Sequence, residues 1–241
     1  MSIEIGHIEA IFRYPVKSMR GEPLQTATLG WHGLDGDRRV AVRCLEGRGG
    51  FPWLTATRLP DLILFTPQRE EGDREALPAS VLTPDGQALP LFGKALAEEI
   101  GRRSGSAVEM MQLRHGIFDD ACISVITSTT VLDICQVAKL GADVRRFRPN
   151  IVVRSTRAVP FEEDGWLGGV LTFGEADDAP AVSVTLRDAR CAMVNFDPDG
   201  GSPAPEVLKA VVRANQNNAG VYGAVTRTGQ LAVGQAVALH Q

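Results

Sequence analysis

Short runs of alternating apolar and polar residues follow one another along the chain and predict a mainly β fold. Residues 3–16 alternate in this way, with many β-branched side chains, and predict a long first strand that Pro15 and Gly21 interrupt. Turns rich in Gly, Asp and Pro separate further short runs, which predict strands at residues 24–29, 38–45, 62–65 and 81–89. Close succession of short strands and tight turns is typical of a barrel or a sandwich.

Helical spacing appears in only a few places. Residues 94–103, followed by Ser104-Gly105, predict one short helix. From about residue 116 the pattern changes: an apolar strand at 121–126 leads into a helix that Ser128 would cap and that ends at Gly141. A second helix is expected where Ser202 provides the cap and Pro203 the first turn. Further strands are expected at 151–154, 170–173, 181–186, near residue 191, at 222–227 and at 236–240.

Composition and charge narrow the class of protein. The chain has 241 residues, which at about 150 residues per domain predicts one large unit or two small interlocked ones. With 44% hydrophobic and 22% charged residues, it is neither disordered nor fibrous. A net charge of −4 gives no reason to expect a nucleic acid as partner. Because no apolar run is long enough to span a bilayer and no signal peptide is evident, a cytoplasmic protein without a membrane span is expected.

The four cysteines do not form a recognisable framework. Cys44, Cys122, Cys135 and Cys191 are widely separated, with no C-x-x-C pair, so neither a disulfide scaffold, a zinc finger nor an iron–sulfur cluster is predicted. Cys191, which follows Arg190, is the one cysteine with a chemical context. A thiolate is both a nucleophile and a soft metal ligand, and nearby cations favour it over the thiol. A buried structural cysteine is the alternative interpretation.

Basic residues gather in one segment in spite of the acidic balance. Arg145, Arg146 and Arg148 fall within four positions, and Asn150 follows Pro149. Pro149 biases Arg148 towards an extended backbone, so Arg148 and Asn150 would project to the same side and could hold a phosphate. A solvated arginine-rich loop is the alternative.

Two other segments carry similar chemistry, each weak when taken singly. Lys17-Ser18 could supply an ammonium and a hydroxyl to a phosphate, and Arg38 follows a glycine turn. Only convergence of these segments with the arginine cluster would indicate a site. The acidic run 161–166 is interpreted as a solvated face rather than as half of a paired-carboxylate hydrolase.

The order of the motifs is more informative than any one of them. Five segments resemble the MOSC superfamily, in the version that carries a MOSC N-terminal β-barrel domain, as in amidoxime-reducing components and the C-terminal region of molybdenum cofactor sulfurases. They cover nearly the whole chain: Tyr14-Pro15-Val16-Lys17-Ser18, Gly33-Leu34-Asp35-Gly36-Asp37-Arg38, Phe147-Arg148-Pro149-Asn150-Ile151-Val152-Val153, Phe161-Glu162-Glu163-Asp164-Gly165-Trp166, and Arg190-Cys191 with Asp197-Pro198.

The resemblance implies a mainly β, β-barrel-based α+β fold with a few helices. A MOSC N-terminal β-barrel domain at residues 1–115 would pack with a MOSC β-barrel domain at 116–241. It also implies that the molybdenum cofactor, a metal-bearing pterin with a phosphate, is bound. Cys191 would be the catalytic residue and the protein ligand to molybdenum, and the cofactor-binding positions would be Lys17, Ser18, Arg38, Thr127, Thr130, Arg148 and Asn150.

The activity implied by the resemblance is an oxidoreductase that reduces N-hydroxylated or N-oxygenated small molecules. Since no iron–sulfur cluster of its own is expected, its electrons would come from a separate iron–sulfur or flavin partner. The alternatives are a sulfur carrier with a persulfide on Cys191, a molybdenum-cofactor carrier, or a barrel kept as an interaction module. Pyridoxal phosphate binding is associated with the family as a whole, but no desulfurase domain of that type is recognised in this chain.

Two positions depart from the family pattern. Met19 stands where many relatives have Cys after Lys-Ser, and Thr57 stands where the Leu-Thr-x-Arg segment usually has Arg, with Arg58 next to it. The second departure could alter a cofactor contact.

Overall fold

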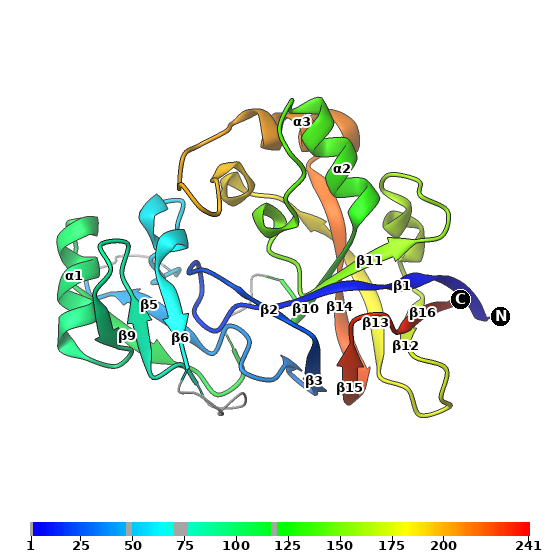
Figure 1. Cartoon of the computed structure of the whole chain (residues 1–241), viewed down its shortest axis with the longest axis horizontal. Helices are drawn as coiled ribbons and strands as arrows, with labels where there is room; N and C mark the ends of the chain where they lie inside the picture. The colour runs from blue at the N-terminus through cyan, green and yellow to red at the C-terminus, as the bar shows by residue number, and fades with distance from the viewer. Residues whose placement is uncertain (1, 47–49, 70–76, 117–119) are drawn as a thin grey trace.

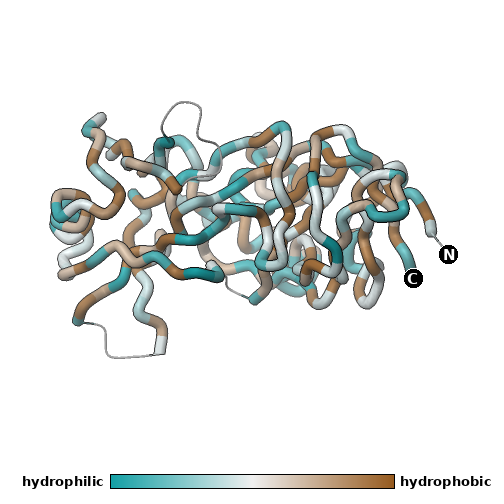
Figure 2. Tube along the Cα trace, turned by 90° about the horizontal axis from the view of Figure 1, so that it is seen from below, coloured by the Kyte–Doolittle hydropathy of each residue, from teal (hydrophilic) through white to brown (hydrophobic). Residues whose placement is uncertain are grey.

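The computed structural model consists of two lobes side by side, a barrel with two helices above it and a smaller β-rich lobe (Figure 1). It describes residues 2–46, 50–69, 77–116 and 120–241. The mainly β, barrel-based fold predicted from the sequence is confirmed. Seen from below, apolar and polar stretches alternate along the chain in both lobes (Figure 2).

Seven strands close the barrel. They follow one another around it in the order β11 (Ile151–Ser155), β10 (Ile123–Thr127), β14 (Asn218–Arg227), β13 (Ala181–Ala189), β12 (Val170–Phe173), β16 (Ala236–His240) and β1 (Ser2–Arg13), and β1 pairs again with β11. Among these seven strands only β10 and β11 are parallel, and α2 (Ser128–Val137) lies in the crossover between them. The strand β2 (Glu22–Leu24) extends β1 beyond the ring.

Alternation along these strands fills the barrel with apolar side chains. Ile8, Ile11, Val125, Phe173 and Leu239 belong to this core and are buried. A second apolar cluster holds α2 and α3 (Glu206–Asn215) against the outside of the barrel. The predicted boundary near residue 115 remains a prediction, and the barrel takes strands from both sides of it, because β1 precedes that boundary.

The smaller lobe has its own core. β5 (Val40–Cys44) pairs with β9 (Val108–Gln112), and β6 (Thr66–Gln68), β7 (Ser80–Leu82) and β8 (Ala88–Pro90) form a second sheet. Helix α1 (Lys94–Ser104) packs beside them and ends at Gly105 in the left-handed conformation. Between the lobes, β3 (Thr26–Gly30) pairs with β4 (Gly33–Leu34) and with β15 (Gly229–Ala232). Short 3-10 helices complete the described fold: η1 (Pro60–Leu64), η2 (Val144–Phe147), η3 (Glu162–Trp166) and η4 (Ala192–Asn195).

Two local predictions were wrong. Residues 62–65 were expected as a strand, but they fall largely in η1, where Pro60 begins a 3-10 helix that buries Leu62 and Ile63. A short apolar run does not distinguish these alternatives by periodicity. The cap of α2 is Thr127, not Ser128: its side chain accepts a hydrogen bond from the Thr130 amide.

The ends of the two predicted helices also differ. α2 ends at Val137, four residues before Gly141. α3 begins at Glu206 rather than next to Ser202, because Pro203 forms a bridge with Phe196 and Pro205 occupies the cap position.

Candidate functional site

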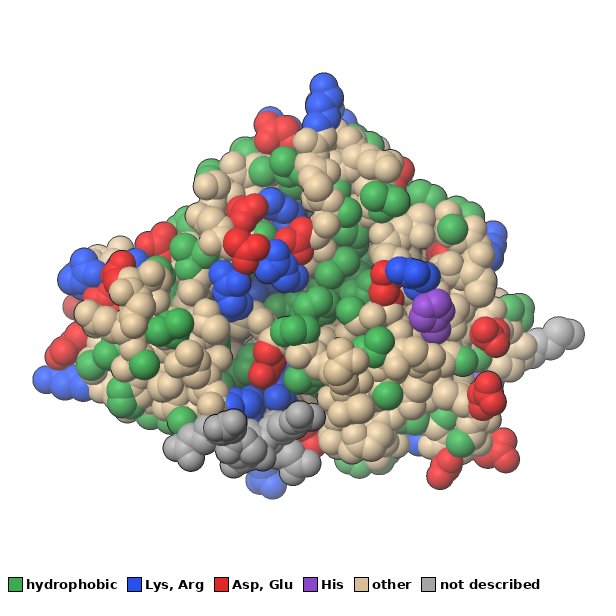
Figure 3. Space-filling model, viewed as in Figure 1, with side chains coloured by type: hydrophobic (Ala, Val, Ile, Leu, Met, Phe, Trp, Pro, Cys, Tyr) green, Lys and Arg blue, Asp and Glu red, His purple; other side chains and the backbone are tan. Residues whose placement is uncertain are grey.

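A cavity of about 370 Å³ lies between the two lobes and brings together residues from distant segments. Five of the residues expected from the sequence line it: Lys17, Ser18, Arg38, Arg148 and Cys191. On the face shown in Figure 3, basic and acidic side chains gather beside a hollow with apolar walls. The predicted convergence of the three basic segments is therefore present in the fold.

Lys17 and Ser18 reach the cavity because the chain turns sharply after β1. Val16 forms a bridge with Val40, and the Lys17 amide donates to the Val40 carbonyl at 2.8 Å. Ser18 then takes a left-handed backbone with φ 67°. Both side chains are 6% exposed, so an ammonium and a hydroxyl form part of a largely buried wall.

Arg38 is held from several sides. Its guanidinium pairs with Asp37, which is fully buried, and donates to the Arg148 carbonyl at 3.0 Å. It also lies 4.9 Å from the centre of the Tyr14 ring. Burial opposes its charge, but Asp37, Tyr14 and Tyr222 together outweigh burial, so the pKa of Arg38 is raised and the group stays cationic.

Arg148 also contacts the Tyr14 ring and has an unexpected backbone conformation. It was expected to be extended before Pro149, but it ends η2 in the left-handed region with φ 50°, which corrects that prediction. Its guanidinium lies 4.1 Å from the Tyr14 ring centre and donates to the Met19 carbonyl at 2.7 Å. These tertiary contacts override the local bias of a residue before proline.

Ser18, Arg38 and Arg148 all have left-handed backbones, with φ between 48° and 67°. A residue with a side chain in this region costs about 1–3 kcal/mol, and such strain clusters at functional sites. Three strained residues on one cavity wall are a reason, independent of charge, to regard the cavity as a binding site.

Three other expected residues do not line this cavity. Asn150 is 1% exposed and lies behind it: its side-chain oxygen accepts from the Ser124 amide at 3.1 Å and from Arg38 at 3.4 Å. Asn150 therefore orients Arg38 within the protein. Thr127 and Thr130 are fully buried at the start of α2, where both hydroxyls lie within 3.0 Å of the Glu163 carboxyl.

Glu163 overturns the interpretation of the acidic run as a solvated face, since it is fully buried. Burial raises its pKa to about 7, although the hydrogen bonds from Thr130 and Thr127 act in the opposite direction. This carboxyl is part of the local structure that begins α2.

Cys191 is exposed and lies two residues after the end of β13, at the cap position of η4. Arg190 also lines the cavity: β13 has ended at Ala189, so the alternation of side chains along a strand does not separate Arg190 from Cys191. The Arg190 side chain is fixed by the Phe147 and Ala219 carbonyls, each at 2.7 Å, and by Asp188 at 2.8 Å. The thiol therefore shares its cavity with several fixed cations.

Sequence reasoning missed some lining residues. Thr55 and Thr57 face the cavity, and their hydroxyls are 2.7 Å apart. The sequence did contain a signal for these two residues: Thr57 departs from the family pattern, with a hydroxyl in place of an arginine. Arg58 does not line the cavity but donates to the Cys44 sulfur at 3.4 Å. Tyr222 lines the cavity from β14, and no motif pointed to it.

These side chains fit a phosphate-bearing cofactor whose metal takes one protein thiolate. Lys17, Arg38 and Arg148 provide cations, Ser18 and Thr55 provide hydroxyls, and Cys191 provides a soft ligand in the same cavity. No group of three or more His, Cys, Asp or Glu that could hold a metal ion occurs in the part of the chain that the structure describes.

Within the described ranges, no helix is both long and apolar enough to cross a membrane.

Family models match nearly the whole chain. The model for the MOSC domain matches residues 112–238, and the model for the MOSC N-terminal beta barrel domain matches residues 5–113. MOSC domains are associated with proteins that bind the molybdenum cofactor. A comparison with curated proteins gives no match.

One solved structure supports the fold over the whole chain. The YUAD protein from Bacillus subtilis is similar over 100% of this chain and 97% of its own, with 14% identity and a TM-score of 0.53. YiiM from Geobacillus stearothermophilus is similar over 50% of this chain and 54% of its own, with 18% identity and a TM-score of 0.39.

Proposed function

Because this chain belongs to the MOSC superfamily and carries both the MOSC domain and its N-terminal β-barrel domain, we propose that it binds the molybdenum cofactor in the cavity between its lobes. The observation that carries the proposal is the convergence of Lys17, Arg38, Arg148 and Cys191, from distant parts of the sequence, on that cavity.

Each residue has a distinct part in this proposal. Lys17, Arg38 and Arg148 neutralise the phosphate, and Ser18 donates a hydrogen bond to it. Arg38 and Arg148 are already held by Asp37, Asn150 and the Met19 carbonyl, so little side-chain freedom is lost on binding. Cys191 is the metal ligand, because a cysteine sulfur is a soft donor of the kind that such a metal prefers. Thr127 and Thr130 act indirectly, by fixing the start of α2 beside β10.

When bound, the cofactor supplies a two-electron redox couple. We propose that the protein is a cytoplasmic oxidoreductase that reduces N-hydroxylated or related N-oxygenated compounds. The N–O bond breaks, two electrons and two protons enter, and the oxygen leaves as water. The electrons come from a separate iron–sulfur or flavin protein.

Metal analysis tests cofactor binding. Protein purified from a host that makes the cofactor should contain molybdenum and pterin near one equivalent. Cys191→Ala should lose molybdenum, whereas Cys122→Ala, which removes a half-buried thiol elsewhere, should retain it. Well-folded wild-type protein that contains neither molybdenum nor pterin after exposure to the cofactor would refute the proposal.

The exposure of Cys191 favours one second candidate, a carrier of sulfur as a persulfide. Under this alternative, incubation with a cysteine desulfurase should leave a cyanide-labile sulfur on Cys191, and the protein should reduce no N-hydroxylated compound when electrons are supplied chemically. Reduction of such a compound that is lost in Cys191→Ala would favour the oxidoreductase.

A further inference from the structure

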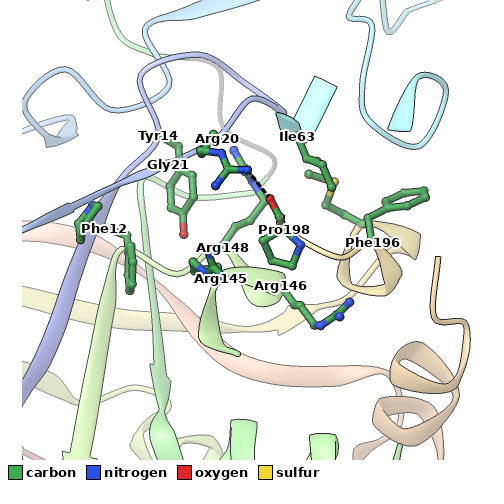
Figure 4. Close-up of a pocket in the computed structure, with 12 residues that line it drawn as sticks. Phe12, Tyr14, Arg20, Gly21, Ile63, Arg145, Arg146, Arg148, Phe196 and Pro198 are labelled. Atoms are coloured by element: carbon green, nitrogen blue, oxygen red, sulfur yellow. Dashed lines mark hydrogen bonds between the residues drawn. The ribbon is translucent and has the colours of Figure 1, made fainter. Parts of the chain in front are cut away.

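A second cavity, of about 260 Å³, adjoins the first and lies between the end of β1 and the chain that follows η4 (Figure 4). Arg146, Arg148 and Met193 line both cavities and form the wall between them. Its other walls include Phe12, Tyr14 and Phe196. We call it the tyrosine pocket, because Tyr14 lines it and not the first cavity.

Tyr14 has an unused hydrogen-bonding group in this pocket. Its side chain is 2% exposed, and its hydroxyl has no hydrogen-bond partner among the described residues. In Figure 4 the phenolic oxygen points into the space beside Arg148. Burial raises the pKa of Tyr14 to about 12, so the group remains an O–H donor at neutral pH. A buried hydroxyl without a partner is unfavourable, and a ligand that accepted its proton would remove this cost.

The ring cannot turn away from the pocket easily. A Cβ on Gly21 would lie 2.3 Å from the Tyr14 ring, so the ring packs directly against the Gly21 backbone. The Arg148 guanidinium stacks on the ring at 4.1 Å. The hydroxyl is therefore held in place before any ligand binds.

The pocket is also rich in cations. Arg20, Arg145, Arg146 and Arg148 line it, and the Nε atoms of Arg20 and Arg146 are buried without a partner in the described part of the chain. Carboxylates offset some of this charge: Asp199 pairs with Arg20 and Arg145, Asp197 pairs with Arg146, and Asp143 pairs with Arg145. The four guanidinium groups, with two unpartnered Nε atoms among the described residues, make the pocket suited to an acceptor or an anion.

The remaining lining is apolar and partly aromatic, with Phe12, Ile63, Met193 and Phe196. A ligand for such a pocket has a small flat apolar body and an anionic acceptor group, as an aromatic carboxylate does. We propose that the tyrosine pocket binds a small aromatic acid, with its carboxylate accepting from the Tyr14 hydroxyl beside the arginines. The claim that the pocket binds such an acid does not rest on the proposed function. Only a role of the bound acid as substrate would rest on it.

Binding of benzoate to the purified protein, followed by calorimetry or by ligand-observed NMR, tests the proposal. Benzoate should bind saturably and about ten-fold more tightly than benzyl alcohol, which has a similar ring but no charge. Tyr14→Phe removes only the hydroxyl and should weaken benzoate binding about five- to ten-fold. Tyr222→Phe removes the other tyrosine hydroxyl of the sequence, which lies in the first cavity, and should leave benzoate affinity unchanged.

Three results would overturn the proposal: no saturable binding of benzoate, equal affinity in wild type and Tyr14→Phe, or binding that is lost when the first cavity is filled with cofactor. The last would assign the pocket to the cofactor.

Tyr14→Phe should unfold at no lower urea concentration than wild type, because the hydroxyl has no partner to lose among the described residues; this control shows that the variant is folded. Since benzoate binding is measured without molybdenum, failure of this proposal is separate from failure of the proposed function.

Discussion

The buried carboxyl of Glu163 gives the sharpest prediction about stability. It lies at the start of α2, fully buried, and accepts hydrogen bonds from the Thr127 and Thr130 hydroxyls at 3.0 and 2.9 Å. We consider the substitution Glu163→Gln, which keeps the size of the side chain and an oxygen for both hydroxyls. It removes the possibility of a negative charge and replaces the oxygen that lies 3.5 Å from the Thr127 amide by an NH2 group.

The expected effect follows from the pKa. Burial raises the pKa of Glu163 from 4.5 to about 7, so between these pH values the folded protein keeps a proton that the unfolded chain has released. The free energy of unfolding therefore decreases as pH rises through this range and is constant, for this group, below and above it. At about 1.4 kcal/mol per pH unit the total is about 3 kcal/mol. Because a glutamine side chain cannot titrate, the Glu163→Gln variant should lack this decrease.

Urea unfolding at pH values from about 4.5 to about 8, followed by tryptophan fluorescence, measures this difference. Trp166, which lies in the same 3-10 helix as the substitution and is buried, should report the transition. Relative to wild type, Glu163→Gln should become more stable by about 3 kcal/mol between the lowest and the highest pH. Glu206→Gln, at an exposed position of α3, serves as control and should follow the wild-type profile. If wild type and Glu163→Gln showed the same dependence on pH, the reasoning would be refuted.

Three further predictions concern the site and the fold. Arg148→Ala should weaken cofactor retention by about 1.5–3 kcal/mol, seen as lower pterin content after dialysis, because one charged hydrogen-bonding contact is lost; unchanged content would remove Arg148 from the site. Iodoacetamide should label Cys191 well before Cys135, since Cys191 is exposed whereas Cys135 is buried and burial raises the pKa of its thiol. Peptide mapping measures the order of labelling, and labelling of Cys135 first would contradict this prediction. Gly33→Ala should lower the free energy of unfolding by about 1–3 kcal/mol, because φ is 97° and the new Cβ would lie 2.7 Å from a carbonyl oxygen. Gly234→Ala, with φ 91° and open space, should cost less in the same urea experiment.

The sequence was most informative in the order of its motifs, because the segments together resemble one family although each is weak when taken singly. The Lys17-Ser18, Arg38, Arg148 and Cys191 segments could each be recognised, and the fold brings them to one cavity. The β-rich pattern also predicted the architecture, because alternation along the strands marks one face for the barrel core.

Features that depend on tertiary contacts could not be predicted in this way. The left-handed backbone of Arg148 is fixed by Tyr14 and the Met19 carbonyl, which lie far away in the sequence. Glu163 lies in an acidic run that, from the sequence alone, is typical of a solvent-exposed loop. It is buried because the fold packs it against α2. The unpartnered hydroxyl of Tyr14 can be recognised only once the neighbouring donors and acceptors of the described chain have been placed.

The closure of the barrel by β1 has a consequence for how the protein folds during synthesis. Gly6 pairs with Ser155, and Ser2 pairs with His240. The strands β11 and β16, with which β1 pairs, therefore leave the ribosome much later than β1 does. Loops this long close slowly, and the smaller lobe, whose strands lie between residues 40 and 112, can form before β1 has paired with β11 and β16. Until the last strand emerges, the apolar side of β1 is available to chaperones and to other nascent chains.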